Sequence, residues 1–341
     1  MRILLGMSGG LDSSYAALKL KEEGHSVEGA VLIMHDFTET ESAREAAREV
    51  GIPLHEIDCR ALFEEKVVTD FISEYTRGRT PNPCIVCNRE VKFRALLDYA
   101  KANGFDKIAT GHYARIENSG NDGKAVISRS SDEKKDQSYM LWRLSRDVID
   151  NLIFPLAECT KEEIRAKAEL LGLSSAKKRD SQEICFIPSG DYGGYIEERV
   201  GKSVPGDFVD VDGKVLGKHN GILHYTIGQR KGLGIALGAR AFITDIDPET
   251  NKITLSFSAD ERSNFTVSDV IFSGIEPKSE GEISDFYVKV RYQATPVFAR
   301  VEFLSDRRAK VSLSLPARSV TAGQSAVFYL GDTLAFGGFI D

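Results

Sequence analysis

The sequence predicts an α/β protein: a doubly wound parallel-sheet domain comes first, and a helical extension and small β domains, the last a C-terminal β-barrel, follow it. Three observations favour this class. Short apolar runs alternate with helical patterns over the first 115 residues, residues from about 140 to 200 are mainly helical in pattern, and Gly-punctuated strands follow Pro205. A chain of 341 residues is also too long for one ordinary domain. We expect the domains to span 1–200, 201–261 and 262–341.

The chain opens with a strand, a Ser/Gly loop and a helix. The apolar run Ile3–Leu5 predicts a buried strand, which the stretch SGGLDSS interrupts. The helix formers of Tyr15–Glu23 follow, with Asp12 or Ser13 as the expected cap. In this geometry, backbone N–H groups and the N-terminus of a helix converge on one point. We therefore expect the loop to attract an anion such as phosphate.

Strands and helices continue to alternate after this unit. We expect strands at 27–34, 53–58 and 107–112, and helices at 41–51, 61–76 and 88–102. Such alternation indicates parallel βαβ units, whose ligands bind at the carboxyl ends of the strands. Gly111 and His112 should therefore lie at the same sheet edge as the Ser/Gly loop.

Local signals support the elements of the second half. Thr160–Glu163 is a capping box that begins a helix, and Gly172 is expected to end that helix. The stretches DPETNK and SDRRAK predict hairpin turns between strands. Trp142, the single tryptophan, is expected in the core.

Composition limits the class of protein. The hydrophobic content of 42% and the charged content of 28% are typical of a soluble globular protein. No segment approaches the roughly 18 apolar residues that a membrane span needs, and the N-terminus has no secretory signal, so we expect a cytoplasmic protein without a membrane partner. The net charge of −7 disfavours nucleic-acid binding, but two stretches are basic. Residues 199–240 hold seven Lys/Arg against three Asp, and 286–318 hold seven against two acids.

The Ser/Gly loop matches neither common nucleotide motif. It lacks the G-x-x-x-x-G-K-[ST] of a Walker A site and the G-x-G-x-x-G of a dinucleotide fold. Its S-G-G-x-D-S pattern resembles the signature of the ATP pyrophosphatase (PP-loop) superfamily, in which ATP is split between its α and β phosphates. Ser8, Ser13, Ser14 and the glycine amides suit pyrophosphate, and the Asp12 carboxylate suits Mg²⁺.

The cysteines point to sulfur chemistry. Cys84 and Cys87 lie in GRTPNPCIVCNREVKF, where Asn88 is the expected helix cap, and a cysteine at a helix N-terminus has a lowered thiol pKa. A zinc site would need a second C-x-x-C or H-x-x-H motif, which the chain lacks. Cys185 lies about a hundred residues later, so only folding could bring it close. Cys59 and Cys159 are interpreted as structural.

Seven motifs together resemble one family. GMSGGLDSS, GRTPNPCIVCNREVKF, ATGHYARI, KDQSYML, DSQEICFI, HYTIGQRKGLGI and VRYQATP occur in the order and spacing of the tRNA-specific 2-thiouridylase family, over nearly the whole chain. The resemblance implies ATP-dependent adenylation of O2 of the wobble uridine in tRNA, followed by sulfur transfer that gives 2-thiouridine, AMP and pyrophosphate. The partners implied are the anticodon arm of a tRNA and a protein that donates persulfide or sulfide sulfur. We expect a monomer.

The resemblance also assigns roles to single residues. Cys87 is implied as the nucleophile and Cys185 as the persulfide carrier, with Cys84 among the catalytic cysteines. The residues implied to bind ATP are Gly6, Met7, Ser8, Gly9, Gly10, Leu11, Asp12, Ser13, Leu32 and Gly111. The residues implied to contact the target base are Asn82, Pro83 and Cys84, and those implied to contact the rest of the tRNA are His112, Lys135, Asp136, Gln137, Arg291, Tyr292 and Gln324.

One departure from the family pattern leaves the mechanism open. Cys84 stands where well-known members carry Asp. Cys84, Cys87 and Cys185 could therefore bind three irons of a [4Fe–4S] cluster with the fourth iron open to sulfide, as an alternative to a persulfide relay. Two other functions also compete: ligation or amidation of a small molecule, and non-catalytic RNA binding. In HYTIGQRKGLGI, we favour RNA-backbone contact for Gln229, Arg230 and Lys231.

Overall fold

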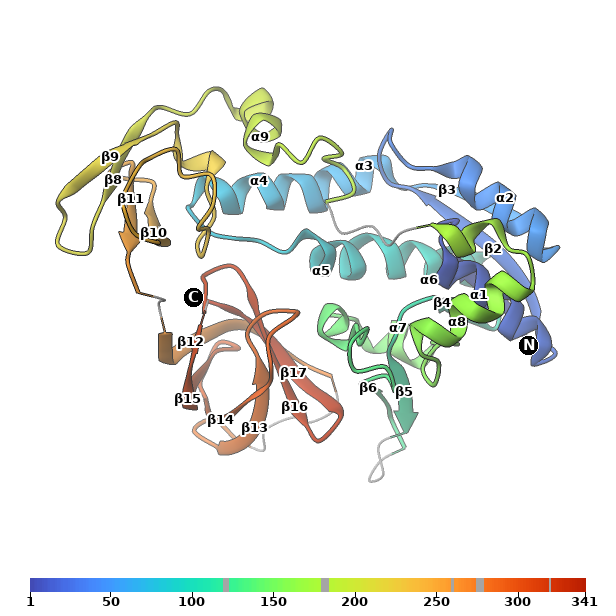
Figure 1. The fold of residues 1–341 in the computed structure, drawn as a ribbon. Helices are drawn as coiled ribbons and strands as arrows, with labels where there is room; N and C mark the ends of the chain where they lie inside the picture. Colours follow the sequence, from blue (N-terminus) through green and yellow to red (C-terminus); the bar gives the residue numbers. More distant parts are fainter. Residues whose placement is uncertain (119–122, 179–183, 259–260, 274–278, 319) are drawn as a thin grey trace.

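Three sheets make up the protein (Figure 1). The computed structural model describes residues 1–118, 123–178, 184–258, 261–273, 279–318 and 320–341. A five-stranded parallel sheet lies at one end and a four-stranded sheet at the other. A closed barrel lies beside the helices that run between them.

The N-terminal sheet is doubly wound, as predicted. Its strand order is β3-β2-β1-β4-β7 and every pairing is parallel. The strands are β1 (Arg2–Gly6), β2 (Ser26–Ile33), β3 (Leu54–Asp58), β4 (Lys107–Thr110) and β7 (Leu152–Ile153). Alternate residues of β1 enter different cores, because side chains alternate across a strand: Leu4 packs on one face, Ile3 and Leu5 on the other. Helices therefore cover both faces of the sheet.

The helices of this domain follow the predicted order with one difference. They are α1 (Leu11–Glu22), α2 (Thr40–Val50), α3–η1–α4 (Arg60–Thr76) and α5–η2–α6 (Pro83–Ala102). The predicted start of the last helix at residue 88 is wrong, because Asn82 caps the helix and Pro83 occupies its first turn. The Asn82 side chain accepts a hydrogen bond from the Cys84 N–H at 3.2 Å, the bond that an N-cap makes.

A helical extension follows the sheet domain. Its elements are η3 (Ser138–Leu141), α7 (Arg146–Asp150), α8 (Lys161–Leu170), η4 (Ser174–Lys177) and α9 (Tyr192–Val200). The capping box at Thr160 is confirmed, and Trp142 is fully buried, as predicted. Trp142 Nε1 donates to Ser325 Oγ at 3.0 Å, so this core residue joins the extension to the barrel.

The remaining strands form two β units. The four-stranded sheet has the order β10-β11-β8-β9; its elements are β8 (Gly206–Val209), β9 (Val215–His219), η5 (Ile222–His224), β10 (Phe242–Asp247) and β11 (Lys252–Ser256). The barrel has the order β12-β15-β14-β13-β16-β17, and pairing of β12 with β17 closes it. Its strands are β12 (Glu261–Phe272), β13 (Ile283–Lys289), β14 (Val297–Phe303), β15 (Ala309–Arg318), β16 (Ser325–Leu330) and β17 (Thr333–Ile340). The predicted barrel and both predicted hairpins are confirmed.

Two further findings concern the chain as a whole. A hairpin from the first half, β5 (Arg115–Asn118) and β6 (Ala125–Ser128), pairs with β17, which the sequence did not indicate. Among the described helices, none combines the length and the apolar character that crossing a membrane requires.

Candidate functional site

The phosphate loop, Gly6–Ser13, connects β1 to α1 at the carboxyl edge of the parallel sheet. The predicted cap by Asp12 or Ser13 is wrong: Gly10 is the N-cap of α1 and supplies no side-chain bond. The Ser13 and Ser14 hydroxyls donate instead to the Gly10 carbonyl, at 3.1 and 3.0 Å. Ser13 Oγ also accepts from the Ser8 N–H at 3.3 Å. These bonds within the loop fix its backbone before any phosphate arrives.

Close backbone contacts hold the phosphate loop against its neighbours. Gly9 has φ +73°, and a Cβ there would come within 2.4 Å of the Ser42 backbone in α2. A Cβ on Gly111, just after β4, would come within 2.8 Å of the Asp12 backbone. The sheet edge predicted for Gly111 is therefore confirmed, and only glycine fits at both contacts.

Asp12 is held by two residues that the sequence did not single out. Lys161 Nζ lies 2.8 Å from both carboxylate oxygens of Asp12, and the Tyr113 hydroxyl donates to Oδ1 at 2.7 Å. Lys161 is the first residue of α8 and its side chain is only 8% exposed, whereas that of Asp12 is 31% exposed. The sequence signal for Lys161 was the capping box, which places this lysine at the first position of α8.

The phosphate loop suits a nucleotide phosphate. It combines fixed serine hydroxyls, glycine amides, the N-terminus of α1 and the buried Lys161, together with Lys178, whose Nζ donates to the Gly9 carbonyl at 3.2 Å. Mg²⁺ fits less directly, since both Asp12 oxygens already face Lys161. A magnesium ion at Asp12 would need phosphate oxygens as further ligands. Leu32, predicted near the adenosine, is buried in β2 of the same sheet.

The thiol cluster consists of Cys84, Cys87 and Cys185, which the fold brings together. The charge of a Cys84 or Cys185 thiolate would raise the pKa of Cys87, and that of Cys84 would raise the pKa of Cys185. Cys84 and Cys185 reach the surface, whereas Cys87 is buried and donates from its Sγ to Met34 Sδ at 3.6 Å. The fold thus brings Cys185 within electrostatic range of the C-x-x-C pair, and a catalytic site built from all three thiols stays a prediction. The stretch 179–183, just before Cys185, lies outside the described residues.

The prediction of a lowered thiol pKa is wrong for both Cys84 and Cys87. Burial raises the pKa of Cys87 to about 12, because the thiolate would lose its hydration. Desolvation also raises the pKa of Cys84 and Cys185, but since both side chains reach the surface, only Cys87 is held firmly as a neutral thiol. The helix N-terminus lies at Cys84, whereas Cys87 falls in the interior of the helix. The partial positive charge of the N-terminus is small there, so it does little to stabilise a Cys87 thiolate.

Lys92 is the cation of the thiol cluster, and the sequence analysis missed it. It lowers the pKa of all three thiols and that of His112. Lys92 ends the π-helical turn η2 (Asn88–Lys92), so it lies five residues after Cys87, one π turn along the same helix. The only sequence signal was the spacing of this lysine from the C-x-x-C pair.

The described residues offer no ready metal site. Within the described ranges, no three Cys, His, Asp or Glu side chains gather closely enough to hold a metal ion. Cys84, Cys87 and Cys185, as they lie here, therefore do not fit a [4Fe–4S] cluster. The buried Cys59 lies outside the thiol cluster.

Several residues predicted to contact tRNA make internal hydrogen bonds. Asp136 is buried and accepts from Ser130 N, Ser138 N and Ser138 Oγ. Gln137 Oε1 accepts from the Tyr113 N–H at 3.0 Å. These bonds make the side chains of Asp136 and Gln137 part of the scaffold; Lys135 and Tyr292 are each partly exposed. RNA contact by this set stays a prediction.

Gln324, another residue predicted to contact tRNA, links the barrel to the cysteine helix, α5 (Pro83–Cys87). Gln324 is buried and donates to the Thr80 carbonyl at 2.7 Å, and the Thr80 N–H donates to Ala322 at 3.1 Å. Asn82 and Pro83 follow directly, so the barrel holds the start of the cysteine helix. Arg291 donates to Thr321 Oγ1 at 2.8 Å.

His112 is held as a neutral imidazole beside the phosphate loop. Burial lowers the pKa of His112 to about 3, because the charged ring would lose its hydration. Its Nδ1 lies 2.8 Å from Thr110 Oγ1, and its ring packs on Phe93 with centroids 5.5 Å apart. His112 is therefore suited to hydrogen bonding with RNA and not to ion pairing with a phosphate.

Comparisons with known proteins cover the whole chain. The family models described as tRNA methyl transferase HUP domain, tRNA methyl transferase PRC-barrel domain and Aminomethyltransferase beta-barrel domain match residues 1–189, 193–256 and 262–340. A tRNA-specific 2-thiouridylase MnmA of Carboxydothermus hydrogenoformans is 43% identical over 100% of this chain and 97% of its own length. One of Acetivibrio thermocellus is 42% identical over 99% of each. A solved 4-thiouridine synthetase–RNA complex with bound ATP superposes on 54% of this chain and 44% of its own, at 20% identity and with a TM-score of 0.38.

Proposed function

The chain belongs to the tRNA-specific 2-thiouridylase family, and we propose that it thiolates position 2 of the wobble uridine in tRNA. The observation that carries this proposal is the thiol cluster: Cys84, Cys87 and Cys185 converge in a protein that also has a fixed phosphate loop. A loop alone would fit any enzyme that splits ATP at the α phosphate. Three thiols together with the loop fit sulfur insertion into an adenylated substrate.

Adenylation comes first in the proposed reaction. The O2 atom of uridine attacks the α phosphorus of ATP, and pyrophosphate leaves. Ser8, Ser13 and the loop amides hold the phosphates. Lys161 offsets the negative charge of the Asp12 carboxylate, which would otherwise repel them. Activation is needed because the uridine oxygen is otherwise a poor leaving group. Mg²⁺ bound by the phosphates and Asp12 would neutralise the charge of the departing pyrophosphate.

Sulfur transfer follows in two balanced steps. The terminal sulfur of a Cys185 persulfide attacks C2 of the adenylated base, a C–S bond forms and AMP leaves. The Cys87 thiolate then attacks the sulfur of Cys185, the bond between the two persulfide sulfurs breaks, and 2-thiouridine is released with a Cys87–Cys185 disulfide. A dithiol reductant regenerates the thiols, and a sulfur-donor protein restores the persulfide. Cys84 is proposed to lie beside the base with Asn82 and Pro83.

The remaining expectations complete the proposal. We favour the persulfide relay because the described cysteines do not fit a cluster as they lie. The enzyme is proposed to act in the cytoplasm as a monomer on the anticodon arm, with domains spanning 1–200, 201–261 and 262–341. RNA contact is proposed for His112, Lys135, Asp136, Gln137, Arg291, Tyr292 and Gln324.

A pyrophosphate-release assay tests the proposal. We expect release from ATP only when unmodified tRNA is present, and 2-thiouridine when a persulfide donor is added. Release with a small metabolite instead would indicate a ligase or amidase. No release under any condition would indicate a non-catalytic RNA-binding protein, and either result would refute the proposed function.

A further inference from the structure

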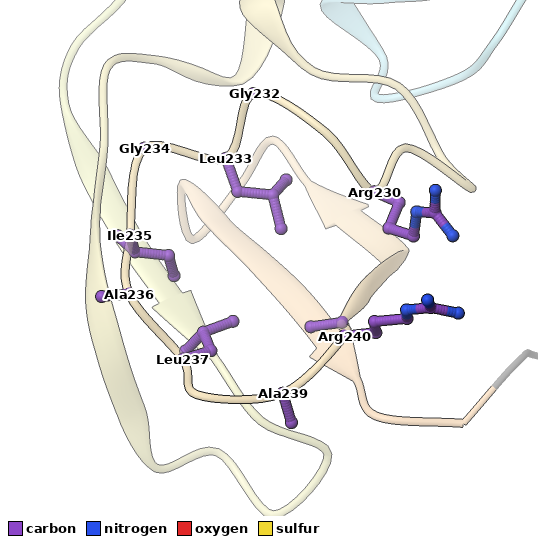
Figure 2. A pocket seen from close by; sticks show the side chains of 10 residues that line it. Arg230, Gly232, Leu233, Gly234, Ile235, Ala236, Leu237, Ala239 and Arg240 are labelled. Carbon is purple, nitrogen blue, oxygen red and sulfur yellow. The ribbon is translucent and has the colours of Figure 1, made fainter.

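One loop of the four-stranded sheet unit forms a pocket that the proposed reaction does not use. The loop pocket has a volume of about 660 Å³ and is lined only by residues between Arg230 and Ala241, in the connection between η5 and β10. Figure 2 shows Leu233, Ile235 and Leu237 directed into it, while the guanidinium groups of Arg230 and Arg240 lie together on one side. The pocket thus has an apolar floor and a cationic rim.

Hydrogen bonds fix the base of the loop. The Gly228 N–H donates to the Ile243 carbonyl at 2.7 Å, and the Ile243 N–H donates back to Gln229 at 3.0 Å. The Gln229 side chain accepts from Thr226 N and donates to the Lys231 carbonyl at 2.9 Å. Gln229, predicted from the sequence to contact RNA, is therefore a residue that shapes the loop.

Apolar packing fixes the tip of the loop. Leu233 is buried in the core of the four-stranded sheet, and Ile235 packs on the same core. A Cβ on Gly217 of β9 would come within 2.8 Å of Ile235, so strand and loop are in direct contact. The pocket is therefore formed without a ligand, which lowers the entropic cost of binding one.

The rim of the pocket offers donors without matching acceptors. Within the described ranges, Arg230 and Arg240 are exposed and have no hydrogen-bond or ion-pair partner. In the same part of the chain, Lys218 pairs with Asp207 at 2.6 Å and Arg199 lies 3.8 Å from Glu64. The backbone N–H groups of residues 230–241 likewise donate to no described residue. Two guanidinium groups on one side of the pocket, together with open amides, favour a phosphate, which accepts bidentate hydrogen bonds.

The position of the loop pocket favours a phosphate of the RNA backbone over that of a small molecule. The carbonyl of Ile227, at the base of the loop, accepts from Arg291 at 3.4 Å. Arg291 is one of the residues proposed to contact tRNA, so the base of the loop adjoins the proposed tRNA surface. The apolar floor of the pocket suits the sugar and base that accompany a phosphate in RNA.

We propose that the loop pocket binds one nucleotide of the substrate tRNA, with its phosphate between Arg230 and Arg240 and its nucleoside against Leu233, Ile235 and Leu237. This inference rests on the proposed function and adds a second point of contact away from the thiol cluster. The pocket thus fixes the register of the tRNA on the enzyme, because phosphate contacts position a nucleic acid without reading its sequence.

The test compares Arg230→Gln/Arg240→Gln with Lys214→Gln in the full-length protein. Lys214 is an exposed cation of the same sheet unit, between β8 and β9, and it does not line the pocket. We expect the double variant to bind unmodified tRNA about 10-fold more weakly at ~0.1 M salt, with a log Kd–log salt slope flatter by about 1. The control should change both by much less. A double variant with the Kd and slope of the unmodified enzyme would overturn the proposal.

Two further measurements separate the alternatives. Leu237→Ala removes part of the apolar floor while both arginines remain; it should weaken tRNA binding several-fold without changing the salt slope. Unchanged binding would overturn the placement of the nucleoside. If the double variant loses thiolation with a persulfide-donor protein yet keeps its KM for tRNA in the pyrophosphate-release assay, which needs no sulfur donor, the pocket docks the donor and the proposal is wrong. An unmodified enzyme that fails to release pyrophosphate with tRNA would instead refute the proposed function.

Discussion

The phosphate loop and the thiol cluster differ in how ready they are for chemistry. In the phosphate loop, hydrogen bonds between the serines and the backbone and the Lys161–Asp12 pair already fix the positions of the groups. In the thiol cluster, Cys87 is a buried neutral thiol whose pKa is raised to about 12. Adenylation therefore begins from a preorganised site, whereas sulfur transfer requires a change in the surroundings of a thiol.

The largest expected effect is the loss of thiolation, with pyrophosphate release retained, when a cysteine of the thiol cluster is replaced. Cys87→Ser and Cys185→Ser should each lower the thiolation rate by at least ~1,000-fold, because a hydroxyl cannot carry or release sulfur. Pyrophosphate release with tRNA should stay within about twofold, since no cysteine takes part in adenylation. The measurements are 2-thiouridine formed by mass spectrometry and pyrophosphate released in the same reactions.

The matched control for these variants is Cys159→Ser. Cys159 precedes α8 and lies outside the thiol cluster, so both rates should be unchanged. Normal thiolation by either Cys87→Ser or Cys185→Ser would contradict the assigned roles. Loss of pyrophosphate release in these variants would show that the two regions are not independent.

The same contrast separates what the sequence predicted from what it did not. The phosphate loop was predictable because its strand, loop and helix are contiguous, and the sheet edge followed from βαβ alternation. Lys161 was not, because it contacts Asp12 across 149 residues. The cysteine motifs were equally visible, but the pKa of Cys87 depends on desolvation by side chains from other elements. The capping of the cysteine helix by Asn82 moved its start to Pro83, and that shift placed Cys87 in the helix interior.

The second prediction concerns pH. Because the pKa of Cys87 lies near 12, its thiolate fraction at neutral pH is small and rises with pH. The single-turnover thiolation rate should therefore increase about tenfold per pH unit between pH 7 and 9, roughly 100-fold in all. Pyrophosphate release should change far less over the same range. A thiolation rate independent of pH would show that Cys87 is deprotonated in the tRNA complex, or that its deprotonation does not limit the rate.

The third prediction tests the preorganisation of the phosphate loop. Lys161→Met should lower tRNA-dependent pyrophosphate release about 30-fold, because Asp12 loses its cation and the loop loses a positive charge near the phosphates. Thiolation falls in parallel, since it requires the adenylated base. Lys167→Met, which removes an exposed lysine of the same helix, is the control. A folded Lys161→Met protein, verified by circular dichroism, with the unmodified release rate would show that this pair serves stability alone.

The smallest expected effect lies in the thiol cluster itself. Lys92 lowers the pKa of Cys84, Cys87 and Cys185, so Lys92→Met should reduce each thiolate fraction at a given pH. We expect thiolation at pH 7.5 to fall about fivefold and pyrophosphate release to stay unchanged. Lys92→Arg keeps the charge and should restore most of the rate.

A readout independent of tRNA distinguishes this electrostatic role of Lys92 from a structural one. Iodoacetamide alkylates thiolates, so alkylation of Cys84 and Cys185, the two exposed members of the cluster, should slow several-fold in Lys92→Met and recover at higher pH. A structural defect would instead make the cysteines more accessible and speed the reaction. Equal alkylation rates in the variant and the unmodified protein would show that Lys92 does not stabilise the thiolates. Formation of the thiolates would then depend on the tRNA complex.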